Sequence, residues 1–436
     1  MCTDIDRISV LAKEDPQRQF FSIAHLLTPG ELYVAFVRLR REASAGIDGV
    51  TYEEYEKAAE GNIRKLHQRL TDGKYQCQPL RRVYIPKENG KQRPISIPAL
   101  EDKIVQKAVV ELLNAIYEQD FLNCSYGFRP KRGQHQALDE VGRVLCAQPT
   151  GWILELDITT YFDSIVRKQL MEMIEKRVSD GSILRLIWKW IKVGVIEEGR
   201  LLVSETGTGQ GQPISPLLAN IYLHFVLDVW FEKVVKPRLK GKAHEIRFAD
   251  DAILCFQYKE DAETVLKVLP KRFAKYGLTL HPEKTRLIEF GRFAEENAKK
   301  RGKKPATFDF LGFTHIGARS RRGKFAVHTR TIRKRLRRGL QAVAEWCREH
   351  RHDPVDEQQK TLNAKLRGHY QYYGRPTNFH SIRQFYRQIR RIWREQLGRR
   401  TRGRKLTWER YNTILRQFPL SPPRITHTWA NAVRMT

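Results

Sequence analysis

The sequence predicts an α+β protein that ends in a basic, helical region. Short β runs mix with amphipathic helices between about residues 76 and 318. Hydrophobic residues make up 41% of the chain and aromatic residues 10%, which is typical of a globular protein and not of a disordered or collagen-like chain. After Gly323 the composition changes to helical and arginine-rich segments. At about 150 residues per domain, a chain of 436 residues is expected to form about two to four structural units.

The elements follow from these patterns in chain order. We expect an N-terminal extension over residues 1–75, with helices at 29–41 and 52–70 and a glycine-rich turn at 46–49. The mixed region over 76–318 has β runs at 82–85, 152–158 and 247–256, and helices at 102–117, 216–231 and 260–276. Residues 297–305 are predicted to be a loop before a strand at 307–312. The last region, 319–436, is predicted to be all helical.

The charge of the chain points to a polyanionic partner. Lys and Arg number 79 against 49 Asp and Glu, a formal net charge of +30. Residues 1–300 carry a net +5 and residues 301–436 a net +25. A basic surface that only keeps the protein soluble would not need this asymmetry. The last third is therefore expected to bind nucleic acid.

The sequence shows no targeting or membrane segment and no cysteine zinc motif. No apolar stretch is long enough for a signal peptide or a membrane-spanning helix. The six cysteines lie far apart with no C-x-x-C pair, which argues against a cysteine zinc site and for reduced thiols. We expect a cytoplasmic protein without a membrane partner. The oligomeric state stays open.

Two acidic sites stand out because they interrupt apolar β runs. Asp157 ends one run, and the pair Asp250-Asp251 lies between two others, as at the turn of a tight hairpin. Adjacent acids are common at turns, so the pair alone is weak evidence. Three clustered carboxylates, however, repel one another unless a cation lies among them, and their hard oxygens favour Mg²⁺, with Mn²⁺ as a substitute. Two such ions stabilise the attacking and leaving oxygens of phosphoryl transfer. With the basic charge, this predicts nucleotidyl transfer on a nucleic-acid template.

Seven sequence blocks occur in an order that resembles the motif blocks of bacterial group II intron-encoded reverse transcriptases. They are RPISIPALEDKIVQKAV (93–109), FLNCSYGFRPKRGQHQAL (121–138), LELDITTYFD (154–163), GTGQGQPISPLLANIYL (207–223), RFADD (247–251), LTLHPEKTRLIEFG (278–291) and FDFLGF (308–313). Two later blocks, LNAKLRGHYQYYG (362–374) and GRKLTWERYN (403–412), resemble the maturase region of that family. The resemblance covers roughly residues 45–425.

This resemblance implies a right-hand polymerase fold. Fingers and palm, with an antiparallel sheet, would occupy residues 76–318, and a basic thumb and maturase domain residues 319–436. Asp157, Asp250 and Asp251 match the family's catalytic, metal-binding carboxylates, with Asp157 and Asp250 as the bridging pair. The implied activity is RNA-directed DNA polymerisation, with an RNA template, a DNA primer, deoxynucleoside triphosphates and structured intron RNA as partners.

The resemblance also implies a nucleotide site. Lys87 and Arg93 match residues that contact the triphosphate, and Gln210 and Gly211 match a loop that packs on the incoming nucleotide. Phe162 matches a ring that would block a ribose 2′-hydroxyl; a register slip of one residue would place Asp163 there instead. Two further positions complete the set, Phe248 in the acidic hairpin and Lys284 on the phosphate side.

Three residues depart from the family's pattern. The acidic hairpin usually begins with Tyr, and this chain has Phe248, which keeps the ring and loses the hydroxyl. Gly209 stands where Pro is common, and Gln212 stands where Gly is common. None of the three is a carboxylate of the catalytic set, so we expect effects on fidelity or loop stiffness with catalysis retained.

The basic region combines an apolar helical stripe with arginines. Ile332, Leu336, Leu340, Val343 and Trp346 recur at helical spacing. The arginines expected to contact nucleic-acid phosphates are Arg333, Arg335, Arg337, Arg338, Arg387, Arg390 and Arg391. Aromatic residues interleaved with the later arginines can stack on unpaired bases, although about half are expected to be core. The chain ends soon after this region, as in family members that lack an endonuclease module.

Two alternatives remain beside the polymerase that also assists intron splicing. One is an RNA-binding splicing factor without polymerase activity, which loss of a catalytic carboxylate would indicate; all three are present. The other is a host-recruited reverse transcriptase no longer tied to an intron, which only the flanking DNA would separate from the first.

Overall fold

The computed structural model describes residues 4–86, 92–197, 200–202, 206–400 and 406–428. These residues form two compact units, each built from several stretches of the chain. The first unit comprises residues 1–137, 154–254 and 260–286, and the second comprises 138–153, 255–259 and 287–436. Within the described residues, no helix is long and apolar enough to cross a membrane.

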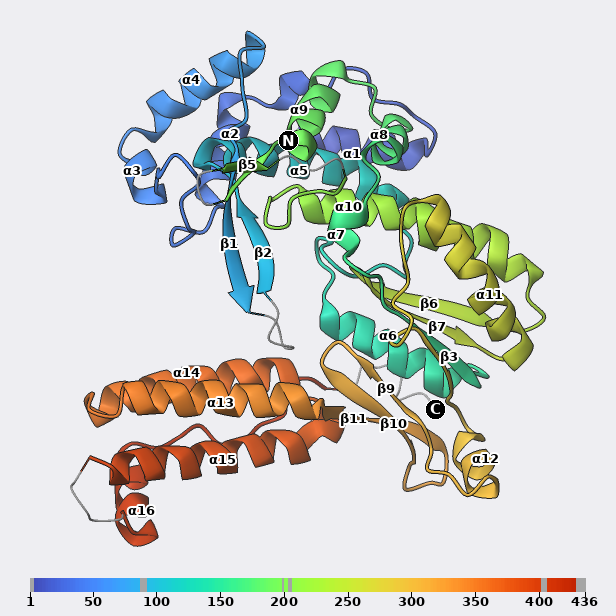
Figure 1. Ribbon diagram of the computed structural model, residues 1–436, viewed down its shortest axis with the longest axis vertical. Helices are drawn as coiled ribbons and strands as arrows, with labels where there is room; N and C mark the ends of the chain where they lie inside the picture. Colours follow the sequence, from blue (N-terminus) through green and yellow to red (C-terminus); the bar gives the residue numbers. More distant parts are fainter. Residues whose placement is uncertain (1–3, 87–91, 198–199, 203–205, 401–405, 429–436) are drawn as a thin grey trace. The chain divides into compact units, whose positions relative to one another are not determined.

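The first unit is mainly helical. Its α-helices are α1 (Asp4–Glu14), α2 (Pro29–Val37), α3 (Tyr52–Glu56), α4 (Ala59–Thr71), α5 (Leu100–Asp120), α7 (Tyr161–Ser164), α8 (Arg167–Glu175), α9 (Gly181–Lys192), α10 (Ser215–Leu223) and α11 (Lys259–Lys275). Helix α5 is buried on most of its circumference and contacts α1, α2 and α10 (Figure 1). Its buried residues lie on most of its faces and include the polar Asp102, Lys103 and Gln106, so α5 is the central helix of this core.

Two four-stranded sheets include strands of the first unit. Strands β1 (Leu80–Pro86), β2 (Gln92–Ile97), β4 (Val195–Glu197) and β5 (Arg200–Leu202) form a sheet in the order β2-β1-β4-β5. A second sheet has the order β6-β7-β3-β8, from β6 (Ala243–Phe248), β7 (Asp251–Phe256), β3 (Trp152–Leu156) and β8 (Arg286–Glu289). The neighbouring strands β3 and β7 bring the two predicted acidic sites to one sheet.

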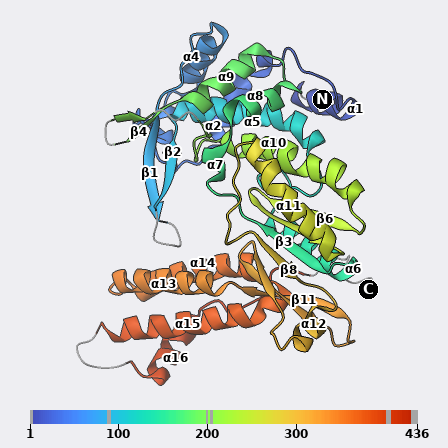
Figure 2. The ribbon, with the colours of Figure 1, turned by 45° about the vertical axis from the view of Figure 1, so that its right-hand side comes forward.

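The second unit combines a small sheet with a helical bundle. Its sheet has the order β11-β10-β9, from β9 (Thr307–Phe310), β10 (Phe313–Arg319) and β11 (Phe325–Thr331). Its helices are α6 (Gln134–Ala147), α12 (Ala294–Lys300), α13 (Arg333–Glu349), α14 (Val355–Tyr373), α15 (Phe379–Gly398) and α16 (Trp408–Gln417). Helices α13, α14 and α15 lie side by side around a buried cluster that includes Leu366, Ile389 and Trp393 (Figures 1 and 2).

Three expected elements differ from the structure. The helix expected over 52–70 is two helices, α3 and α4, because Tyr52 and Tyr55 pack on Phe36 and the chain breaks at residues 57–58 before continuing. The helix expected over 216–231 is α10 followed by two π-helical turns, His224–Asp228 and Phe231–Val235. Part of the expected loop at 297–305 belongs to α12, whose Glu295–Lys299 and Glu296–Lys300 pairs at i,i+4 favour a helix.

The region from residue 319 was predicted to be all helical, and this prediction is wrong. It begins with strand β11, which pairs antiparallel with β10. The side chains of Val327, Thr329 and Thr331 are buried in alternation with more exposed neighbours, which is the period of a strand with one covered face. The helical stretch therefore starts at α13, where Leu336, Val343 and Cys347 face the buried cluster.

Candidate active site

Asp157 lies at the end of a buried strand. It directly follows β3, whose residues 153–156 are buried, and its own side chain is 30% exposed. The main-chain carbonyl of Asp157 accepts a hydrogen bond from the N–H of His281 at 2.8 Å. The Nζ atom of Lys284 lies 3.0 Å from Oδ2 of Asp157. The structure thus brings two predicted site residues, Asp157 and Lys284, into an ion pair.

Asp250 and Asp251 occupy different positions in the β6–β7 hairpin. The sequence predicted both carboxylates at the turn, but Asp251 is the first residue of β7 and its side chain is exposed. Asp250 lies in the two-residue turn and is half-buried. Ala249, before it, has φ +57°, a left-handed conformation that costs energy for a residue with a Cβ. The surrounding structure therefore has to hold this turn in place.

The electrostatic surroundings of Asp250 connect it to other predicted site residues. Burial raises the pKa of the Asp250 carboxyl above its usual value, and the charge of Asp157 raises it further. The positive charges of Arg93 and Arg247 act in the opposite direction. Asp157 and Arg93 are therefore close enough to Asp250 to influence its ionisation.

The predicted nucleotide-contacting loop packs on strand β2. The carbonyl oxygen of Gln210 accepts a hydrogen bond of 2.6 Å from the N–H of Ser96. Gly211 has φ +111°, and a Cβ there would lie 2.6 Å from the carbonyl oxygen of Ser96, so only glycine fits. Arg93 is exposed on the same strand, three residues before Ser96. Lys87, its predicted partner, lies outside the described residues.

Phe162 is on a helical turn and not on a strand. A slip of one residue exchanges two faces only in a strand, but residues 161–164 form the short helix α7. The ring of Phe162 is half-buried and its centroid is 5.5 Å from that of Tyr161. The carbonyl oxygen of Phe162 accepts a hydrogen bond of 2.9 Å from the N–H of Thr208, so the loop that carries Gln210 also binds α7. Phe248, the last residue of β6, is half-buried beside the acidic turn.

Arg247 is a site residue to which sequence analysis gave no role. Its side chain is fully buried, and its guanidinium makes five hydrogen bonds of 2.6 to 3.1 Å. Two bonds go to Asp228, and one each goes to Asn220, Ser125 and the carbonyl oxygen of Ala249. Burial opposes the charged form, but the Asp228 carboxylate outweighs it, and the pKa of Arg247 is raised.

This network holds the acidic turn. The last bond reaches the carbonyl that directly precedes Asp250, and a Cβ at Gly127 would lie 2.3 Å from the main-chain nitrogen of Ala249. Asn220 also donates a hydrogen bond of 2.6 Å to the carbonyl oxygen of Gly127. A signal was present in the sequence, because an arginine inside an apolar β run has to be paired when it is buried.

A second acidic cluster lies behind the hairpin. Ligand atoms of Cys124, Asp228 and Glu245 lie within 4.8 Å of one another, a spacing compatible with a metal ion. Burial raises the pKa values of both the Cys124 thiol and the Glu245 carboxyl well above their usual range. Asp228 is already paired with Arg247 at 2.6 Å. The cluster is therefore a core network around Arg247 and differs from the predicted catalytic carboxylates.

The predicted phosphate-binding arginines lie on two helices of the second unit. On α13, Arg333, Arg337 and Arg338 are exposed and Arg335 is half-buried. On α15, Arg387 and Arg391 are exposed, and Arg391 pairs with Glu395 at 3.0 Å. Arg390 is half-buried, with its guanidinium 5.8 Å from the ring centre of Tyr386. The exposed members are open to solvent, whereas Arg335 and Arg390 are partly covered by protein.

Comparison with known proteins assigns the family. The family described as "Reverse transcriptase (RNA-dependent DNA polymerase)" matches residues 85–315 of this chain. This range contains all the site residues described above in the first unit. This match covers more than half of the chain. The chain therefore belongs to the reverse transcriptase family.

Several curated relatives are encoded by introns. The chain is 33% identical over 304 residues to the group II intron-encoded protein LtrA of Lactococcus lactis, a match that covers 67% of this chain and 50% of the relative. It is 37% identical over 250 residues to protein YkfC of Escherichia coli, a match that covers 56% of this chain and 64% of that relative. A putative COX1/OXI3 intron 1 protein of Saccharomyces cerevisiae is 31% identical over 212 residues, covering 48% and 25%.

These matches confirm the resemblance to group II intron-encoded reverse transcriptases and maturases that the ordered blocks indicated. The chain spans half to about two thirds of the length of the first two relatives. The α+β fold with its antiparallel strand pairs also agrees with this family.

Proposed function

We propose that this protein is an RNA-directed DNA polymerase that extends a DNA primer on an RNA template. The observation that carries the proposal is the approach of two carboxylates at adjacent strands of one sheet. Asp157 follows β3, Asp250 precedes the neighbouring strand β7, and the charge of Asp157 raises the pKa of Asp250. In this proposal residues 76–318 act as fingers and palm, and residues 319–436 as thumb and maturase region.

The donor set fits Mg²⁺, or Mn²⁺ in its place. Carboxylate oxygens are hard ligands, and the mutual effect of Asp157 on Asp250 is the repulsion that a bound cation relieves. Asp157 and Asp250 would hold the ions, with Asp251 beside them. When bound, the ions stabilise the attacking and leaving oxygens of the displacement. Lys284, whose Nζ lies 3.0 Å from Asp157, offsets part of the negative charge of the two carboxylates.

The residues around the carboxylates would bind the incoming nucleotide. Arg93 and Lys87 would contact the triphosphate and balance the charge that develops on the leaving pyrophosphate. The loop with Gln210 and Gly211 would pack against the nucleotide, supported by its hydrogen bond to β2. Phe162 would exclude a ribose 2′-hydroxyl and so favour deoxynucleotides.

The second unit would bind RNA. The exposed arginines of α13 and α15 lie in the part of the chain with a net charge of +25. Because group II intron-encoded relatives include LtrA, we propose that the RNA is the parent intron and that binding assists its splicing and mobility. The competing function, a splicing factor without polymerase activity, has no structural feature in its favour among the described residues.

A primer-extension assay tests the proposal. Wild-type protein with Mg²⁺ should extend a DNA primer on an RNA template, and Asp250→Asn should abolish extension while RNA binding stays nearly intact. Asp72→Asn, which changes an exposed carboxylate outside the site, is the matched control and should extend normally. Near-normal extension by a folded Asp250→Asn variant would refute the assignment. Strong RNA binding by a wild-type protein that does not extend the primer would support the splicing factor instead.

A further inference from the structure

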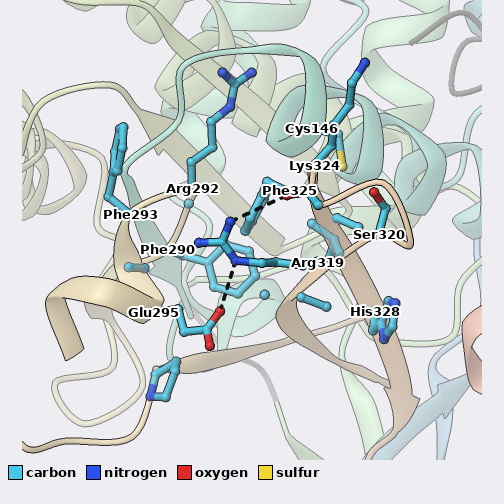
Figure 3. A pocket seen from close by; sticks show the side chains of 18 of the residues that line it. Cys146, Phe290, Arg292, Phe293, Glu295, Arg319, Ser320, Lys324, Phe325 and His328 are labelled. Atoms are coloured by element: carbon cyan, nitrogen blue, oxygen red, sulfur yellow. Dashed lines mark hydrogen bonds and ion pairs between the residues drawn. The ribbon is translucent and has the colours of Figure 1, made fainter. Parts of the chain in front are cut away.

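A cavity of about 960 Å³ lies in the second unit, and the proposed polymerisation does not use it (Figure 3). Its walls come from α6, from the segment that joins β8 to α12, and from the β10–β11 hairpin. The volume lies within the range of about 300–1,000 Å³ that is usual for sites that bind a small organic ligand. All its lining residues belong to the second unit.

Small residues and aromatic rings give the cavity its form. Gly142 on α6 has no atom within 4 Å of the position that a Cβ would occupy, so one wall is open because a side chain is missing there. Phe290 is buried and packs edge-to-face on Phe325, with ring centres 6.2 Å apart. Phe293, by contrast, is 70% exposed at the side of the cavity. Flat aromatic surface is therefore available inside and beside the hollow (Figure 3).

The rim carries an excess of positive charge. Five cationic side chains line the cavity, Arg292, Arg319, Arg321, Arg322 and Lys324, against two carboxylates, Glu295 and Glu296. Glu295 and Glu296 form ion pairs of 2.8 and 2.9 Å with Lys299 and Lys300 of their own helix. Arg319 extends toward Glu295 at 3.8 Å (Figure 3). Arg292, Arg321 and Arg322 have no ion pair within the described residues, so the rim remains suited to an anion.

We propose that this cavity binds an unpaired nucleotide of an RNA strand, with the base against the aromatic rings and the adjoining phosphates against the arginines. An aromatic surface next to arginines is the combination that proteins use for unstacked bases of structured RNA. A base in a duplex could not enter, because its faces are covered by its neighbours. The inference rests on the proposed function only in taking RNA as the partner.

Filling the cavity tests the proposal. Gly142→Leu adds a side chain where there is free space, on a helix that tolerates it, and leaves every arginine in place. The probes are an RNA hairpin with a single-nucleotide bulge and the same hairpin fully paired, measured by fluorescence anisotropy. We expect Gly142→Leu to weaken binding of the bulged hairpin about fivefold or more, since fivefold is the lower end of the range for loss of one stacked base. The affinity for the paired hairpin should be unchanged.

The control for added bulk is Gly61→Leu, at a helical glycine of α4 that also has free space around it. It should bind both hairpins as wild type does. A second pair of variants tests the aromatic ring with every arginine kept. Phe293→Ala should weaken binding of the bulged hairpin selectively, and Phe293→Tyr should not. Equal affinities of wild type and Gly142→Leu for the bulged hairpin, or an equal weakening for both hairpins, would overturn the proposal and leave a protein partner as the occupant to seek.

Primer extension on a short annealed template distinguishes a failure of the cavity proposal from a failure of the proposed polymerase function. Gly142→Leu should extend such a template at the wild-type rate, because none of the carboxylates is altered. A protein that extends primers but does not discriminate the hairpins disproves only the cavity assignment. Discrimination without extension disproves only the polymerase.

Discussion

The side chain of Gln212 occupies, together with that of Leu80, the space that a Cβ at Gly209 would need. The distance from such a Cβ to Nε2 of Gln212 would be 2.9 Å, shorter than real contacts of this kind. Gln212 cannot easily move, since it is 2% exposed, accepts a hydrogen bond of 2.8 Å from Gln106 and donates one of 3.2 Å to the carbonyl oxygen of Trp190. The two departures from the family's pattern, Gly for Pro and Gln for Gly, are therefore parts of one packing arrangement.

This coupling predicts a non-additive pair of substitutions. Gly209→Pro should lower the free energy of unfolding by about 1–3 kcal/mol, because the ring is forced against Gln212. Gln212→Gly alone should also destabilise the protein, because its buried hydrogen bonds are removed. The double variant should recover part of the stability, with a coupling energy of about 1 kcal/mol or more in a double-mutant cycle measured by denaturant unfolding. Strictly additive effects would show that the two residues do not share the space.

The sequence indicated the candidate carboxylates better than it indicated the residues that support them. Asp157 and Asp250 stood out because each interrupts an apolar run, and a carboxylate at the end of a buried strand is costly unless it is paired. The place of Arg247 in an apolar run indicated that it needs partners. The partners themselves could not be found, because Ser125, Asn220 and Asp228 come from segments far apart in the chain. Their approach depends on tertiary packing, which no local pattern encodes.

The same limit explains an error about the basic region. The arginines after Gly323 drew attention to helices, and the alternation of Val327, Thr329 and Thr331 was overlooked. Strand β11 forms because it pairs along its edge with β10 in an antiparallel register. In this stretch, composition indicated the charge of the surface correctly and the secondary structure incorrectly.

Replacement of Arg247 should reduce catalysis through the position of Asp250. Arg247→Lys keeps a positive charge next to Asp228 but cannot make all five hydrogen bonds. We expect the stability to fall by about 1–3 kcal/mol, because buried groups are left unpaired. The rate of primer extension, kcat, should fall more than tenfold, about 1.4 kcal/mol in the barrier, while the affinity for primer–template stays close to wild type.

Ser125→Ala is the control for this effect. It removes one bond of 2.8 Å from the same guanidinium and leaves the bond to the Ala249 carbonyl in place. Its stability should fall, and kcat should change little. If kcat falls in both variants in proportion to their stability, Arg247 supports the fold in general and has no specific effect on the acidic turn.

The ring of Phe162 should decide the choice of sugar. Phe162→Ala is expected to raise kcat/KM for ribonucleotides relative to deoxynucleotides, because the group opposed to the 2′-hydroxyl is removed. Phe162→Tyr keeps a ring at the same place on α7 and should retain the selectivity. The measurement is single-nucleotide incorporation with each sugar on one RNA template. Selectivity that is unchanged in Phe162→Ala and altered in Asp163→Ala would move the assignment to the neighbouring residue.

Salt dependence should separate a phosphate-binding surface from an ordinary basic one. The residues to neutralise are the exposed arginines, since Arg335 and Arg390 are half-buried and their replacement would also disturb packing. Replacement of Arg333, Arg337, Arg338 and Arg387 by Gln should weaken RNA binding and flatten the slope of log affinity against log salt. Each arginine–phosphate interaction that is removed should change that slope by about 0.7–0.9, because fewer counterions are released on binding.

A matched variant removes the same charge from the first unit, at the exposed residues Lys57, Arg64, Lys168 and Lys271. If the net charge of the whole chain governed binding, both variants would change the slope equally. If the arginines of α13 and α15 contact phosphates, only the first variant changes it strongly. Primer extension on a short annealed template at low salt should survive in both, because Asp157 and Asp250 are unaltered. A wild-type slope in the first variant would mean that α13 and α15 present a solvated face, and the phosphate-binding surface would then lie on other basic residues.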